Sequence, residues 1–101
     1  MKVTCENISR HLKVTVAGEL DHHAARDAVQ RIGYAIETAI PKSCEIDMKG
    51  LTFMDSSGIA VVLNTYKKMK SFNGTTTVTN TPVYAKKVLS AAGVDRIIPI
   101  E

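Results

Sequence analysis

Residues 44–69, CEIDMKGLTFMDSSGIAVVLNTYKKM, contain the clearest structural pattern in the chain, a strand followed by a loop and a helix. In its first part apolar and charged residues alternate, and this period of two predicts a short half-buried strand with Cys44, Ile46 and Met48 on its inner side. A loop that contains Leu51 and Phe53 follows. Apolar residues then recur at helical spacing and predict an amphipathic helix whose apolar side holds Ile59, Val62, Leu63, Tyr66 and Met69.

The residues before this stretch predict a hairpin and a first helix. Apolar residues alternate with polar ones in two short segments, which predicts two strands that contain Val3, Cys5, Leu12, Val14 and Val16. A tight turn near Ser9 and Arg10 joins them, and Gly18 ends the second strand. Asp21 can cap the next helix, and Pro41 closes it. The apolar face of that helix is Ala25, Ala28, Val29, Ile32, Ile36 and Ile40.

The residues after this stretch predict a strand, a third helix and a final strand. Asn73 and Gly74 accept the left-handed backbone that ends helices, and the β-branched run 75–79 favours a strand. Thr81 is expected to cap the third helix, with Pro82 in its first position. The apolar side of that helix is expected to be Tyr84, Val88, Leu89 and Ala92. A last strand is expected from Ile97, Ile98 and Ile100, and Pro99 suggests a sheet edge or the end of that strand.

This order of elements predicts a single α/β domain over residues 1–101. Strands that alternate with helices form parallel sheets with right-handed crossovers, whereas the opening hairpin adds an antiparallel pair. We therefore expect a mixed, mostly parallel sheet of about five strands with three helices packed on it.

Composition excludes several classes of function. The net charge is +3, and no aromatic residues interleave with the lysine clusters to stack bases, so nucleic-acid binding is not expected. No apolar run reaches the roughly 20 residues that span a bilayer, and no signal-peptide pattern occurs, which favours the cytoplasm. Cys5 and Cys44 are expected to be buried, reduced thiols. No metal-ligand spacing occurs, and neither a metal nor a cofactor is expected. A monomer is the default.

Two junctions between a strand and a helix carry candidate functional residues. Sites in open α/β sheets form at the carboxyl ends of strands, and here these are residues 18–23 (GELDHH) and 53–58 (FMDSSG). A hydroxyl at a helix start lies beside unpaired N–H groups and the positive end of the helix dipole, which stabilise a phosphate. Asp55 or Ser56 can serve as the N-cap. Ser57 then has no capping role, and spacing alone leaves a functional serine and a plain helix start equally open.

Two motifs resemble a known family. LTFMDSSG, residues 51–58, is similar to the signature of anti-sigma factor antagonists of the STAS family. GELDHH, residues 18–23, resembles the matching segment of the sporulation members, and the order of strands and helices agrees over essentially the whole chain.

The resemblance implies a phosphorylation switch. In the family the second serine of DSSG, here Ser57, is phosphorylated by the anti-sigma factor, which is itself a serine kinase. The unphosphorylated antagonist binds the anti-sigma factor and frees the sigma factor, and a PP2C-type phosphatase resets the phosphoserine. Asp21 matches an acidic residue close to the switch serine. The expected contact surface for the partner is Glu19, Asp21, Met54, Asp55, Ser56, Ser57 and Gly58.

Several of these residues have a structural role as an alternative. Capping is favoured over partner contact for Asp55, and the two are equally open for Asp21. Ile59 is expected in the core, whereas Met54 is an apolar anchor candidate. Gly58 lets a kinase approach closely, or is a tolerated first-turn glycine.

Two other functions compete with the switch. A hydrolase would need Ser57, an acid and one of His22 or His23 as a triad, but the G-x-S-x-G elbow is absent. A STAS-domain sensor would bind a nucleotide or another small ligand, but the chain lacks a P-loop sequence.

Overall fold

Four strands form one mixed sheet in the computed structural model, which describes residues 1–101. The sheet order β1-β2-β3-β4 follows the chain order, with β1 antiparallel to β2 and the other two pairs parallel. The elements are β1 (Lys2–Ile8), β2 (His11–Leu20), α1 (His22–Ala39), β3 (Ser43–Met54), α2 (Ser57–Ser71), β4 (Thr75–Thr79), α3 (Val83–Ala91) and the 3-10 helix η1 (Val94–Arg96). The mixed, mostly parallel sheet and its antiparallel hairpin are confirmed, with four strands in place of about five.

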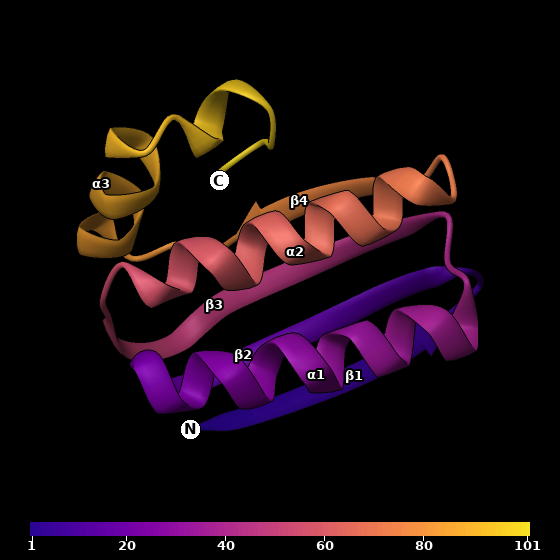
Figure 1. The fold of residues 1–101 in the computed structure, drawn as a ribbon, viewed down its shortest axis with the longest axis horizontal. Helices are drawn as coiled ribbons and strands as arrows, with labels where there is room; N and C mark the ends of the chain where they lie inside the picture. The colour runs from indigo at the N-terminus through magenta and orange to yellow at the C-terminus, as the bar shows by residue number, and fades with distance from the viewer.

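Two helices cover one face of this sheet. Figure 1 shows α1 and α2 side by side along the strands, while α3 lies beyond β4 near the C-terminus. The crossovers from β2 through α1 to β3, and from β3 through α2 to β4, place both helices on the same side. None of the helices combines the length and the apolar character needed to cross a bilayer.

The hairpin turn is built as its sequence predicts. Ser9 and Arg10 both have positive φ, 50° and 64°, which matches the twist of a two-residue hairpin loop. The carbonyl of Arg10 also accepts a hydrogen bond from the backbone N–H of Lys42 at 2.8 Å. The turn therefore fixes both the β1–β2 register and the entry of β3.

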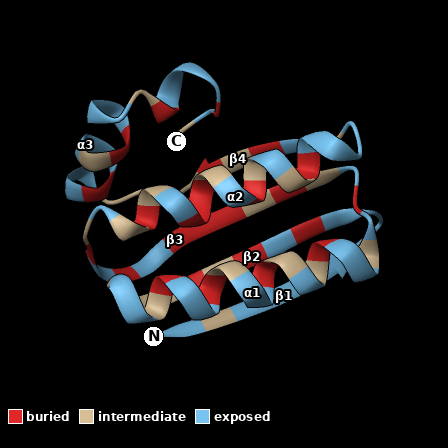
Figure 2. Ribbon diagram, viewed as in Figure 1, coloured by how far each residue is buried: buried red, intermediate tan, exposed pale blue.

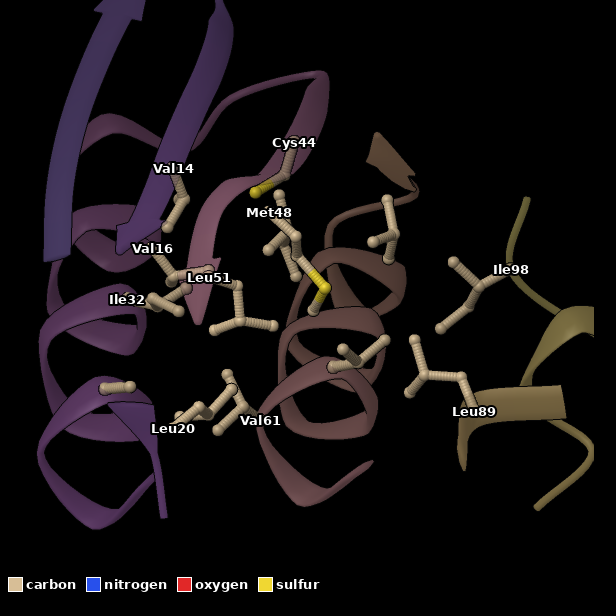
Figure 3. Packing of buried hydrophobic residues seen from close by; sticks show 14 of the residues in the cluster. Val14, Val16, Leu20, Ile32, Cys44, Met48, Leu51, Val61, Leu89 and Ile98 are labelled. Atoms are coloured by element: carbon tan, nitrogen blue, oxygen red, sulfur yellow. The ribbon is translucent and has the colours of Figure 1, made fainter. Parts of the chain in front are cut away.

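The core lies between the sheet and the helices (Figure 2). Alternate residues of β2 and β3 point toward one face of α1 and one face of α2, as the close view in Figure 3 shows for Val14, Val16, Ile32, Met48 and Val61. Each such side chain contributes about 1.5–3 kcal/mol through removal from water. Most of the predicted apolar face of α1 lies inward: Ala25, Ala28, Ile32 and Ile36 are buried, and Val29 is partly buried. The prediction for Ile40 is wrong, because this residue is the left-handed C-cap after the helix and is 47% exposed.

The opposite face of the sheet carries a network of polar side chains. The Glu45 carboxylate accepts a hydrogen bond from Thr79 Oγ1 at 2.6 Å and lies 3.3 Å from His11 Nε2. Asp47 is buried, and its carboxylate accepts hydrogen bonds from the Lys49 N–H at 2.9 Å and from Asn80 Nδ2 at 3.1 Å. Burial by itself would raise the pKa of Asp47, but these two donors and Lys13, 3.6 Å away, together lower it.

The lowered pKa of Asp47 predicts a specific acid sensitivity. Because the folded pKa lies below the ordinary value of 3.8, the unfolded chain binds more protons, and the stabilisation is present above that value. It is lost as the pH falls through the folded pKa. Asp47→Asn should therefore cost about 1 kcal/mol near neutral pH and flatten the acid limb of the stability curve. Urea unfolding at a series of pH values measures this, and an unchanged acid limb would contradict it.

The C-terminal strand prediction is wrong. Residues 94–96 form η1, and the segment after it meets β4 only through one bridge between Val78 and Ile100. Gly93 turns the chain with φ 79°, and Pro99 has no N–H to donate to a ladder. Three backbone hydrogen bonds tie this segment to the chain around β4, from Val78 to Pro99, from Glu101 to Val78 and from Thr81 to Glu101.

Other local predictions are also corrected. The third strand does not stop near Met48, because β3 continues through Leu51 and Phe53 to Met54, paired with β2, which runs past Gly18 to Leu20. Cys5 is exposed, because residues of β1 lie on the uncovered edge strand, whereas Cys44 is buried.

The start of α3 differs as well. The residue before its first turn is Pro82, and Thr81 Oγ1 is buried without a hydrogen bond instead of capping the helix. Ala85 and Leu89 form the buried face of α3. Tyr84 and Ala92 are exposed, although the Tyr84 hydroxyl donates to the Leu51 carbonyl at 3.1 Å.

Candidate functional site

The two predicted junctions lie next to each other at the carboxyl end of the sheet. Leu20 at the end of β2 and Met54 at the end of β3 are register partners. The backbone N–H of Asp55 donates to the Leu20 carbonyl at 3.3 Å and joins the two junctions directly. The parallel pairing of β2 and β3 therefore places the GELDHH and DSSG segments on one corner of the molecule.

Ser57 is the first residue of α2 and is partly exposed. The Asp55 carboxylate accepts a hydrogen bond from the Ser57 backbone N–H at 2.8 Å, so Asp55 occupies one of the free donors of the first turn. Ser56 stands at the N-cap, but its side chain makes no capping hydrogen bond. The Ser57 hydroxyl makes no hydrogen bond within the protein. It is therefore a free hydroxyl at a helix start.

Asp21 is the N-cap of α1. Its Oδ1 accepts a hydrogen bond from the Ala24 backbone N–H at 2.9 Å, and this bond is the main reason why the pKa of Asp21 is lowered. The predicted capping role is confirmed. Glu19 is exposed two residues earlier, in register with Phe53 of β3, which is 46% exposed. The corner thus combines the carboxylates of Glu19 and Asp21 with the exposed ring of Phe53. From the sequence, Phe53 was expected only to lie in a loop.

Met54 and Gly58 lie beneath this corner. The Met54 side chain is only 4% exposed, so it does not offer the exposed apolar anchor expected from the sequence. Gly58 is buried on top of it: a Cβ at this position would lie 2.5 Å from both Cγ and Sδ of Met54, and 3.2 Å from Cδ2 of Leu20. The first turn of α2 can therefore rest on the end of β3 only because residue 58 has no side chain. Ile59 packs partly buried against the core, as expected.

This contact predicts opposite effects for two glycine substitutions. Gly58→Ala should destabilise the chain by about 1–3 kcal/mol, because the added methyl overlaps Met54 in a packed environment. Gly33→Ala in the middle of α1 is the control, since its Cβ would meet only the flexible end of Lys68 at 3.5 Å. It should gain up to about 1 kcal/mol from helix propensity. Chemical denaturation measures both, and a neutral Gly58→Ala would contradict this packing.

A groove between α1 and α2 opens beside Ser57. Its volume is about 340 Å³, and it is lined by His22, Ala25, Arg26, Val29, Gln30, Ser57 and Ala60. Neither His22 nor His23 makes a side-chain hydrogen bond; their rings contact each other edge to face with centroids 6.0 Å apart. The triad arrangement considered for a hydrolase is therefore not formed between Ser57 and these rings. No group of three His, Cys, Asp or Glu side chains is placed to hold a metal ion.

Arg26 lines the groove beside Ser57 but was not among the site residues predicted from the sequence. The signal that could have found it is its spacing, because Arg26 follows His22 by four residues and therefore lies on the same face of α1.

Comparison with known proteins agrees with this fold. The STAS domain profile matches residues 2–101, so the chain belongs to the STAS domain family. A relative named anti-sigma F factor antagonist, from Paenibacillus polymyxa, is 32% identical over 102 residues, which cover 99% of this chain and 86% of the relative.

Two similar solved structures show one protein in two states. The anti-sigma factor antagonist SpoIIAA in its unphosphorylated form has a TM-score of 0.85 and 27% identity, covering 99% of this chain and 88% of that one. The Bacillus cell fate determinant SpoIIAA in the phosphorylated form has a TM-score of 0.77 and 27% identity, covering 99% and 91%. Both forms of that protein therefore keep the fold described here.

Proposed function

We propose that this chain is an anti-sigma factor antagonist that is switched by phosphorylation of Ser57. In its unphosphorylated form it binds an anti-sigma factor, itself a serine kinase, and so releases a sigma factor. Phosphorylation ends this binding, and a PP2C-type phosphatase restores it. The observation that carries the proposal is the Ser57 hydroxyl, which is free of internal hydrogen bonds and stands at the start of α2 on the corner where β2 and β3 end.

The geometry favours a local switch over refolding. The Asp55 carboxylate accepts a hydrogen bond from the Ser57 backbone N–H, and Gly58 packs against Met54. These two contacts fix the start of α2 without the Ser57 hydroxyl. A phosphate can therefore be attached to that hydroxyl without a change in the helix. The remaining N–H groups and the helix dipole stabilise negative charge at this end. That SpoIIAA has similar folds in both phosphorylation states supports the same view.

The proposed contact surface is the exposed part of the corner. It consists of Glu19, Asp21, Asp55, Ser56 and Ser57, with Phe53 as the apolar contact at its edge and Met54 and Gly58 as the buried support. Relatives named anti-sigma F factor antagonists and the likeness to SpoIIAA support a sporulation pathway. We further propose that the chain acts in the cytoplasm as a monomer.

The direct test is phosphorylation by the cognate anti-sigma factor. The purified chain is incubated with that protein and ATP, and the modified residue is mapped by mass spectrometry of peptides. We expect one phosphate on Ser57, none on Ser56 and no incorporation into Ser57→Ala. Treatment with the phosphatase should remove it. Modification of another residue, or none under conditions where the two proteins form a complex, would refute the proposal.

A further inference from the structure

The groove between α1 and α2 brings a cationic side chain to the switch serine. His22, Arg26 and Gln30 follow each other at intervals of four along α1, and they form one wall of the groove. Ser57 and Ala60, three residues apart, form the other wall on α2. The two helices lie side by side over this length (Figure 1). A group attached to the Ser57 hydroxyl therefore enters a space that Arg26 also borders.

Arg26 has no partner in the protein. Its guanidinium makes no ion pair and no hydrogen bond, although other arginines do. Arg31, on the same helix, pairs with Asp27 at 2.9 Å, and Arg10 donates to the Ile40 carbonyl. Arg26 is thus an uncommitted cation that borders the same groove as Ser57.

The carboxylates near Ser57 come from three segments, and the N-terminal amino group is the one cation at this end outside α1. Asp21 and Asp55 come from the two loops at this end, and each uses one oxygen to bind a backbone N–H; Glu19 is exposed on the end of β2. A phosphate of about −1.5 to −2 charges here is repelled by all three carboxylates. The cationic or titratable groups on its α1 side are Arg26 and His22, with His23 in contact with His22. The charges of His23 and of the N-terminal amino group act on Asp21.

We propose that Arg26 binds the phosphate of phosphorylated Ser57 across this groove, with His22 as a secondary contact. The proposal rests on Ser57 being the modified residue. A guanidinium presents its N–H donors in a planar fork that matches two phosphate oxygens, and such charge-assisted bonds are about twice as strong as neutral ones. Arg26 therefore stabilises the phosphorylated state and holds the phosphate against α1. It has no comparable role while Ser57 carries a hydroxyl.

The test installs phosphoserine at position 57 during translation by an expanded genetic code, so that no kinase is needed. The second ionisation of the phosphate is then followed by ³¹P NMR over about pH 5–8, around its ordinary pKa near 6. Because a nearby cation favours the dianion, Arg26→Gln should raise this pKa by roughly half a unit or more. Arg31→Gln is the matched control, since it removes an equal charge that is already paired with Asp27, and should leave the titration unchanged.

A second measurement separates a contact with phosphate from a general effect on the fold. Arg26→Gln should lower the midpoint of thermal unfolding of the phosphorylated chain but not that of the unphosphorylated chain. Equal ³¹P titrations in wild type and Arg26→Gln, or an equal shift from Arg31→Gln, would overturn the proposal. Failure of the kinase to modify Ser57 would overturn the proposed function alone, because phosphoserine is placed here without the kinase.

Discussion

Ser57→Asp should bind the anti-sigma factor on the order of 100-fold more weakly than the wild-type chain. The substitution places a fixed negative charge at the position where, under the proposed function, the partner meets a neutral hydroxyl. A kinase that phosphorylates Ser57 must hold the phosphates of its nucleotide close to this residue. Two like charges about 5 Å apart at an effective dielectric near 20 repel by roughly 3 kcal/mol. Since about 1.4 kcal/mol is a tenfold change, one such contact is enough for the effect.

The comparison uses three variants and isothermal titration calorimetry or pull-down with the anti-sigma factor. Ser57→Ala should keep binding within a few-fold of wild type, because the hydroxyl is small and makes no internal hydrogen bond. Ser71→Asp puts the same charge at the other end of α2, about 20 Å away, and should bind as wild type. Thermal unfolding must show that Ser57→Asp is folded; an acidic residue in a first turn favours a helix. Equal binding by folded Ser57→Asp and wild type would refute the charge mechanism.

Leu20→Ala should cost about 2–5 kcal/mol of the free energy of unfolding. Leu20 is fully buried at the end of β2, and its side chain packs against the start of α2 at Gly58. Its carbonyl accepts the Asp55 N–H, so the residue supports both loops of the candidate site. Truncation removes apolar contacts and leaves a cavity between β2, β3 and α2. Urea unfolding monitored by circular dichroism measures the loss.

Val83→Ala provides the matched control for this prediction. Val83 is 72% exposed at the start of α3, and its truncation should change stability by no more than about 0.5 kcal/mol. Leu20→Ala should also weaken anti-sigma factor binding if enough folded protein remains, because the cavity adjoins Gly58, the residue after Ser57 at the start of α2. A loss below 1 kcal/mol would show that Leu20 is not the support that its burial indicates.

These predictions separate two functions of the corner. The buried residues Leu20, Met54 and Gly58 hold the start of α2 in place, whereas the Ser57 hydroxyl carries the proposed signal without a structural role. A surface group that makes no internal contact can change charge at little cost to the fold, and a rigid helix start presents that charge in a constant position. Arg26 adds a contact that exists only in the phosphorylated state.

Elements that depend on neighbouring residues could be predicted from the amino-acid sequence. Period-two alternation in residues 12–16 and 44–48 and helical spacing in residues 25–36 predicted buried faces that the structure confirms. The Ser9–Arg10 turn and the Asp21 cap were also predicted correctly, because turn and cap chemistry depends on a few neighbouring residues. The position of Ser57 at the start of a helix was also predicted correctly from the neighbouring residues.

Contacts between residues of different helices and strands depend on the tertiary structure and could not be predicted from the sequence. The burial of Met54 depends on the approach of α2 to β3, and the exposure of Cys5 depends on β1 lying at the sheet edge. The segment after α3 forms η1 and then a single bridge between Val78 and Ile100 in place of the predicted strand. How far this segment pairs depends on where the chain meets β4 after it turns at Gly93. The proximity of Arg26 and Ser57 also depends on the tertiary structure. They are far apart in the chain, and only the packing of α1 beside α2 over a shared parallel sheet brings them to one groove.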